Sequence, residues 1–143
     1  MLPAAWLRAQ TVPQPILDKL IKTYTDKGYK LEKSVLPDFT RPHPNKASYF
    51  YTQCYPGRGV VVVAIMGKKP SDWKLKVGYG SQSAVKSHTI GPINEGSSYY
   101  TDYIITSFPE GVPNSDYCMN VVAYDGDAID LPVYLYIFSF TPK

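Results

Sequence analysis

The sequence predicts a mainly β domain, an antiparallel β-sandwich or open barrel of about seven strands with one N-terminal amphipathic helix. Aromatic residues make up 14% of the chain, and Tyr and Phe favour the half-buried surfaces of pleated sheets. Most of the 13 prolines fall between hydrophobic runs, where they separate strands. A single helical segment comes first and no strand–helix–strand alternation follows, which argues against a parallel sheet.

The helix is predicted from about Pro15 to Lys27. Proline suits the first turn of a helix, and Gly28 suits the left-handed position just beyond its end. Lysines occupy the surface that remains outside the apolar face, so we expect the helix to cover one face of a sheet. The apolar residues that recur at helical spacing are Ile16, Leu17, Leu20, Ile21 and Tyr24.

The rest of the chain is typical of strands separated by Gly, Pro, Asn or Asp. The strand that begins at Trp73 alternates apolar residues with lysines, so one of its faces should contact water. By contrast, the strands at 59–66 and 132–141 are apolar on both faces and need cover on both sides. The seven strands are predicted at 29–35, 48–55, 59–66, 73–80, 98–107, 117–125 and 132–141.

Length and charge limit the classes of protein to consider. The 143 residues suit one domain, which we place at 13–143, after an N-terminal segment at 1–12. That segment is interpreted as an arm or as the remnant of a secretion signal, because an apolar stretch precedes Arg8 and Ala9 without a basic start. The chain holds no apolar run that predicts a membrane span. Its net charge of +3 is dispersed, which argues against a nucleic-acid partner.

Two cysteines, Cys54 and Cys118, each lie inside an aromatic strand pattern. If those strands face each other, a disulfide would close a loop of roughly 65 residues and contribute about 4 kcal/mol in the chain-entropy treatment. A disulfide indicates an oxidising compartment, so we expect an extracellular, periplasmic or cell-surface location. The alternative is a pair of buried free thiols in a cytosolic core. Their number and spacing do not fit a zinc site.

No local motif predicts catalysis. The chain lacks the signatures of serine hydrolases, zinc proteases and phosphate-binding loops. His43 and His88 lie in polar loop segments, where a solvated side chain is the simpler interpretation. Asp125, Asp127 and Asp130 could gather oxygen ligands for calcium, but an Asp-Gly turn accounts for them without an ion. We therefore expect no enzyme and no cofactor, with a small secreted hydrolase kept as an alternative.

The aromatic residues of the last strand supply the main functional hypothesis. They form one side of a two-sided strand, which the helix, a second copy of the chain or a ligand could cover. The candidate binding or assembly surface comprises Tyr134, Tyr136, Phe138 and Phe140, with Trp73 and Tyr79. The sequence thus predicts an exported structural or binding module that self-assembles through aromatic β surface. Alternatively, rings such as Trp73, Tyr79, Tyr99, Tyr100 and Tyr103 stack on a polysaccharide, although aromatic residues at this spacing also form cores and cross-strand pairs.

Overall fold

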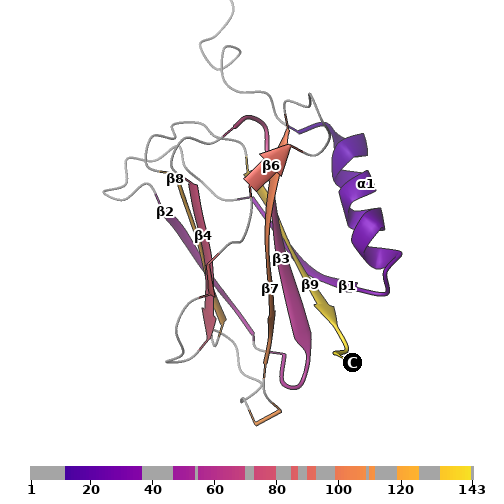
Figure 1. Cartoon of the computed structure of the whole chain (residues 1–143), viewed down its shortest axis with the longest axis vertical. Coiled ribbons are helices and arrows are strands. Elements are labelled where there is room, and N and C mark those ends of the chain that lie inside the picture. The colour runs from indigo at the N-terminus through magenta and orange to yellow at the C-terminus, as the bar shows by residue number, and fades with distance from the viewer. Residues whose placement is uncertain are drawn as a thin grey trace, which may run out of the picture.

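Two antiparallel sheets and one helix make up the fold of the computed structural model (Figure 1). It describes residues 12–36, 47–53, 55–69, 73–79, 85–86, 90–92, 99–108, 110–111, 119–125 and 133–142. The mainly β class with one N-terminal helix is confirmed. The elements are α1 (Gln14–Thr25), β1 (Lys30–Val35), β2 (Ala47–Thr52), β3 (Gly59–Met66), β4 (Trp73–Tyr79), β5 (Val85–Lys86), β6 (Ile90–Pro92), β7 (Tyr100–Ser107), β8 (Met119–Asp125) and β9 (Val133–Phe140).

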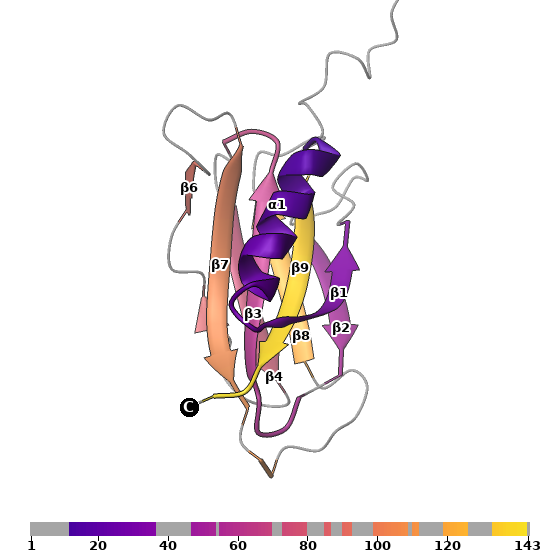
Figure 2. The ribbon, with the colours of Figure 1, turned by 90° about the vertical axis from the view of Figure 1, so that its right-hand side faces the viewer.

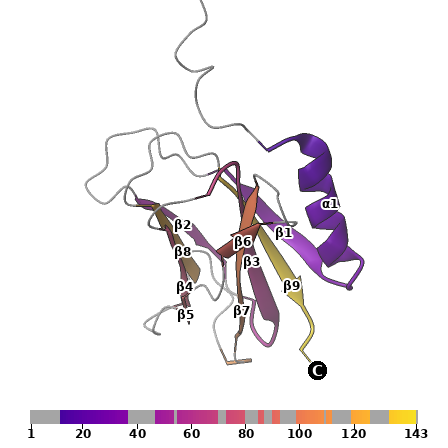
Figure 3. The same ribbon diagram turned by 45° about the horizontal axis from the view of Figure 1, so that its top comes forward.

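The strand order separates neighbours in sequence. One sheet has five strands in the order β1-β9-β3-β7-β6, and the other has four in the order β2-β8-β4-β5. The seven strands of six to eight residues correspond to the seven predicted ones. The short strands β5 and β6 were not predicted, because two or three residues are too few to show a period. Figure 3 shows the two sheets as separate layers, with α1 on the far side of the five-stranded one.

Helix α1 forms where its apolar spacing predicts, and it ends as expected. Gly28 adopts a φ of 90°, a conformation that residues with a Cβ rarely take. The backbone N–H of Tyr29 donates to the carbonyl of Tyr24 at 3.2 Å, and that of Gly28 donates to Thr25 at 3.0 Å. This pair of bonds is a Schellman ending, which satisfies carbonyls that the helix itself cannot pair. The chain then turns directly into β1.

The space between the sheets is filled from both sides. Strand β3 contributes Val60, Val62, Ala64 and Met66, and β9 contributes Val133, Leu135 and Ile137. Strand β4 contributes Trp73, Leu75 and Val77 from the other sheet, whereas its Lys74 is exposed. The predicted alternation of wet and buried faces on β4 is therefore present. The strand lies one place from the edge of its sheet.

A second apolar cluster lies between the five-stranded sheet and α1. The opposite faces of the same two strands enter it, with Val61, Val63 and Ile65 from β3 and Tyr136 and Phe138 from β9. Leu17 is the fully buried residue of the helix, and Val12, which precedes the helix, is buried beside it. Figure 2 shows α1 lying across β3 and β9. The two-sided strands thus receive cover on both faces, as their composition requires.

Candidate functional site

A groove of about 380 Å³ opens between α1, β1 and β9. Three elements that are far apart in sequence meet there because β1 pairs with β9, and α1 packs on the face of both strands. Its walls combine aliphatic, aromatic and uncharged polar side chains. The residues that line it are Gln14, Leu17, Ile21, Ser34, Val35, Leu36, Tyr134 and Tyr136.

Two tyrosines of β9 form the aromatic part of the groove. They lie two residues apart, so both belong to the strand face that looks toward the helix. Tyr136 is 5% exposed and Tyr134 is half-buried. Across from them Leu36 is 63% exposed at the end of β1. A ligand in the groove would therefore remove exposed apolar surface from water, which is favourable.

Polar groups stand at the helix side of the groove. Nε2 of Gln14 donates a 2.8 Å hydrogen bond to Oδ1 of Asp18, one helical turn along. This bond orients the Gln14 amide and uses its nitrogen rather than its carbonyl oxygen. Burial raises the pKa of the Tyr136 hydroxyl, and nearby Tyr134 and Asp18 raise it further. The Tyr136 hydroxyl is accordingly neutral at physiological pH and can both donate and accept.

An aromatic series fixes the helix on the sheet beside the groove. The rings of Tyr24 and Phe138 stack with centroids 4.9 Å apart. Tyr29, just past the helix, stacks on Phe140 at 4.8 Å and meets Tyr24 at 5.9 Å. Such pairs add about 0.5–1.5 kcal/mol each beyond their burial. The groove is therefore bounded by a helix that is held in place at its C-terminal end.

The structure divides the predicted contact surface. Phe138 is fully buried under α1 and offers no area to a partner, and Phe140 is half-buried on Tyr29. Tyr134 and Tyr136 remain as groove-lining residues. Sequence reasoning identified these two tyrosines but missed their neighbours on β1. No local pattern marks Ser34 to Leu36 as neighbours of a strand about 100 residues later; only the β1–β9 pairing does.

Trp73 does not provide an exposed stacking ring. It is 8% exposed, and its indole Nε1 donates to Asp102 at 2.7 Å. The backbone of Tyr79 pairs with that of Met119, and the Tyr79 side chain lies outside the part of the chain that the structure describes. Trp73 therefore cannot form part of the predicted sugar-stacking surface, because the alternation of side chains along β4 directs it between the two sheets.

The remaining predicted tyrosines lie on or next to β7. Tyr99 and Tyr100 are half-buried, whereas Tyr103 is 37% exposed. Their burial follows from cover by the second apolar cluster at Tyr99 and by the inter-sheet core at Tyr100. Of these three tyrosines, Tyr103 therefore has the largest exposed fraction.

Several predicted residues lie outside the part of the chain that the structure describes. They are Cys54, Cys118, His43, His88, Asp127 and Asp130; Asp125 ends β8, but its side chain is outside that part as well. Within the described residues, no three His, Cys, Asp or Glu side chains gather as they would around a metal ion. No described helix is both long and apolar enough to cross a bilayer.

Comparisons with protein-family models, with curated proteins and with solved structures find no match to this chain. A fold of two packed sheets would in any case leave function undecided, since function depends on the site.

Proposed function

We propose that the chain is an exported, non-enzymatic binding module whose groove takes a neutral, sugar-like ring. The observation that carries this proposal is the combination in one groove of two tyrosines, an exposed leucine and uncharged hydrogen-bonding groups. Ligand sites are concave and mostly apolar, with a few convergent polar groups that set orientation. The α1–β1–β9 groove has this composition.

Sugar rings suit such a groove because they have two kinds of surface. Their C–H faces are apolar and can pack against Tyr134, while their hydroxyls at the ring edge need donors and acceptors. Gln14, Ser34 and the tyrosine hydroxyls supply both types of group. The nearby carboxylate of Asp18 adds a negative charge, which disfavours an anionic ligand at this position. The favoured ligand is therefore uncharged.

Export is supported by the pairing of the strands that flank the cysteines. Thr52, the last residue of β2, pairs with Met119, the first residue of β8. Cys54 follows Thr52 by two residues, and Cys118 precedes Met119 by one. A disulfide between them would suit an extracellular, periplasmic or cell-surface protein.

A groove-filling substitution tests the binding proposal. Ser34→Trp places a large ring in the groove from an exposed position of β1. Ser107→Trp makes the same change on exposed β7, away from the groove, and serves as the matched control. Calorimetric titration with cellohexaose, and in parallel with maltohexaose, should show binding that only Ser34→Trp weakens, by about tenfold or more, equivalent to about 1.4 kcal/mol. Equal affinity in the two variants would reject the groove as the site.

Self-assembly is the second candidate function, and the exposed apolar residues of β7 favour it. Ile105 is 48% exposed and Tyr103 lies two residues before it, so both belong to one face of the strand. A second copy of the chain could cover them. Light scattering on a size-exclusion column should then show oligomers that Ile105→Lys reduces to monomers. A concentration-independent monomer of the unmodified protein would remove this candidate.

A further inference from the structure

The outer edge of β7 is open over part of its length. On one side β7 pairs with β3 along all 8 of its residues. On the other side β6 pairs with it only from Tyr100 to Asp102. Among the strands that the structure describes, none pairs with residues 103–107 on this outer side. Figure 2 accordingly shows β6 beside one end of β7.

The hydrogen bonds of Phe108 show which backbone groups face this edge. Its N–H donates to the carbonyl of Arg58 at 2.9 Å, and its carbonyl accepts the N–H of Gly57 at 3.1 Å. Both partners immediately precede β3, so Phe108 directs its groups toward the β3 side. The groups of alternate residues point to opposite sides of a strand. Ile105 and Ser107 therefore each present one donor and one acceptor at the outer edge.

A buried side chain closes one end of the open stretch. Tyr103 also directs its N–H outward, but Oδ1 of Asp102 accepts that N–H at 2.8 Å. No hydrogen bond joins the outward groups of Ile105 or Ser107 to another described residue. The Ile105 side chain is 48% exposed at the same place. Outward backbone groups and exposed apolar surface thus coincide on this short stretch.

The opposite edge of the same sheet is protected against pairing, whereas this edge is not. Strand β1 forms that opposite edge, and it carries the exposed Lys30 and Lys33 and an irregular register between Leu31 and Lys33. Lysines and bulges are common features that keep edge strands from pairing with other chains. Residues 103–107 of β7 read Tyr-Ile-Ile-Thr-Ser, which is uncharged and favours β structure.

We propose that the open edge of β7 pairs antiparallel with the same edge of a second copy of the chain. This inference rests on the self-assembly candidate above and specifies its contact. The neutral stretch meets its own copy without the repulsion that opposed like charges cause. A two-fold axis between the two Thr106 positions places Ile105 opposite Ser107 of the second copy. The outward donor and acceptor of both residues then have partners.

The position of β6 selects this register. With the axis at Thr106, Phe108 of one copy lies opposite Ile104 of the other. The pairing therefore ends before Asp102, where β6 already occupies the edge. Thr106 lies beside Thr106 of the second copy, a cross-strand pair that contributes favourably.

The symmetry of the contact limits the size of the assembly. A two-fold contact uses the same surface on both copies and closes on itself, so it yields a dimer. Pairing of β7 with β1 of another copy would be head-to-tail and would continue as a fibre, but the lysines and the irregular register of β1 oppose it. The paired stretch is short, and small interfaces are weak. We therefore expect a dimer that dissociates on dilution.

Sedimentation equilibrium over a wide range of protein concentrations tests the pairing. Ser107→Pro removes an N–H that donates across the contact and leaves Ile105 and Tyr103 in place. Proline is tolerated on an edge strand where the N–H faces outward. This variant should weaken dimerisation by about tenfold or more, because the symmetric contact loses the same bond in both copies. Ser107→Ala keeps the N–H and is the matched control, which should dimerise normally. Unfolding curves confirm that both variants are folded.

Amide hydrogen exchange of the unmodified protein gives a second readout. Protection of the Ile105 and Ser107 N–H groups should increase with protein concentration. The N–H of Thr106 faces β3 and should be protected at every concentration.

Oligomers that Ser107→Pro leaves intact, without added protection at Ile105 and Ser107, would overturn the edge contact and leave self-assembly standing. A monomer at every concentration would reject both. Assemblies that grow beyond the dimer would overturn the two-fold closure. The cellohexaose titration of the groove is independent of all three outcomes.

Discussion

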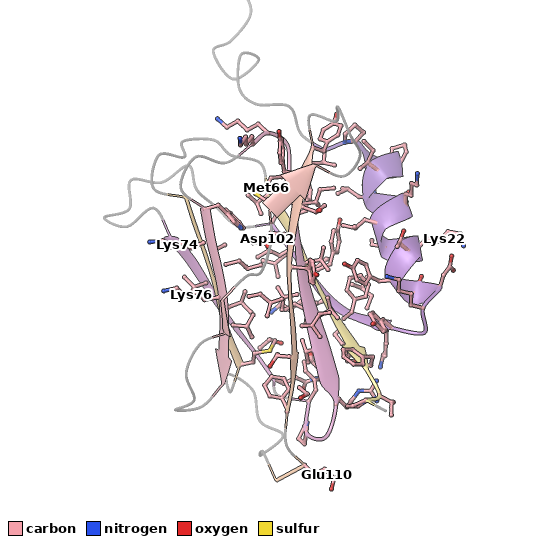
Figure 4. All side chains as sticks on the ribbon, in the orientation of Figure 1. Lys22, Met66, Lys74, Lys76, Asp102 and Glu110 are labelled. Atoms are coloured by element: carbon pink, nitrogen blue, oxygen red, sulfur yellow. The ribbon has the colours of Figure 1, made fainter. Side chains whose placement is uncertain are left out.

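The indole N–H of Trp73 on β4 donates a 2.7 Å hydrogen bond to Oδ2 of Asp102 on β7. Asp102 is completely buried, and its Oδ1 accepts the backbone N–H of Tyr103 at 2.8 Å. Since β4 and β7 belong to different sheets, the Trp73–Asp102 bond links the two layers through their core; Figure 4 labels Asp102 there. A buried carboxylate needs such partners. Moving even a neutral polar group out of water without a hydrogen bond costs on the order of 2–7 kcal/mol, and a charged group costs more.

Trp73→Phe should destabilise the protein by about 1–3 kcal/mol, because it keeps an aromatic ring and removes the donor to a buried acceptor. Asp102→Asn should also destabilise it, because the indole and the Tyr103 N–H donate to different carboxylate oxygens, and asparagine replaces one of these with an NH2 group that cannot accept. Urea unfolding of both variants and of the double variant gives the coupling energy. We expect the double variant to lose less unfolding free energy than the sum of the losses in the two single variants. Strict additivity would show that the two side chains do not stabilise each other.

Gly59→Ala should destabilise the protein by about 1–3 kcal/mol, the usual effect of overpacking. A Cβ at Gly59 would overlap the ring of Phe140, its partner in the β3–β9 register. Chemical denaturation measures the loss. Gly111→Ala is the matched control, because nothing lies within 4 Å of a Cβ there.

The overlap also predicts a rescue. In a Phe140→Leu background the smaller side chain leaves room at position 59, so Gly59→Ala should cost less than in the unmodified protein. The same cost in both backgrounds would mean that backbone conformation, rather than the Phe140 ring, requires glycine.

Alkaline pH should loosen α1 from its sheet. Burial raises the pKa of Tyr24 and of Tyr136 above the ordinary 10.0. The folded state therefore holds these protons more tightly than the unfolded state. Their contribution to stability is complete below pH 10.0 and is lost as the pH rises through the folded pKa values.

Unfolding free energies measured at a series of alkaline pH values check this. The decline should be shallower in Tyr24→Phe/Tyr136→Phe, where the rings stay and the ionising hydroxyls are absent. The stacked pair with Phe138 is retained in that variant. An unchanged decline would assign the pH dependence to other groups.

Protein isolated under air without reductant should contain a Cys54–Cys118 disulfide. The expected intact mass is lower by two hydrogens than that of the reduced chain, and alkylation should label neither cysteine until reductant is added. Replacing both cysteines by serine should then lower stability by about 4 kcal/mol in the chain-entropy treatment. Full labelling of two thiols without reductant would contradict both the bridge and the export that it supports.

Local patterns were sufficient for the helix and the seven longer strands of this fold, but not for β5 and β6. The helix was predicted because its apolar period, Pro15 and Gly28 all lie within one short segment. The two-sided character of β3 and β9 was readable for the same reason, since side chains alternate along each strand. The proposed binding surface was predicted only in part. Phe138 and Trp73 have the composition of a contact surface, yet α1 covers one and the opposite sheet covers the other.

The sequence by itself determined that this chain makes strands with two buried faces and a helix to cover one of them, because alternation and helical spacing depend on neighbours a few residues apart. Only the tertiary structure decided where β1 meets β9 and where Trp73 meets Asp102. These contacts follow from strand order and register, which depend on how segments that are distant in sequence pack together and bury their apolar side chains.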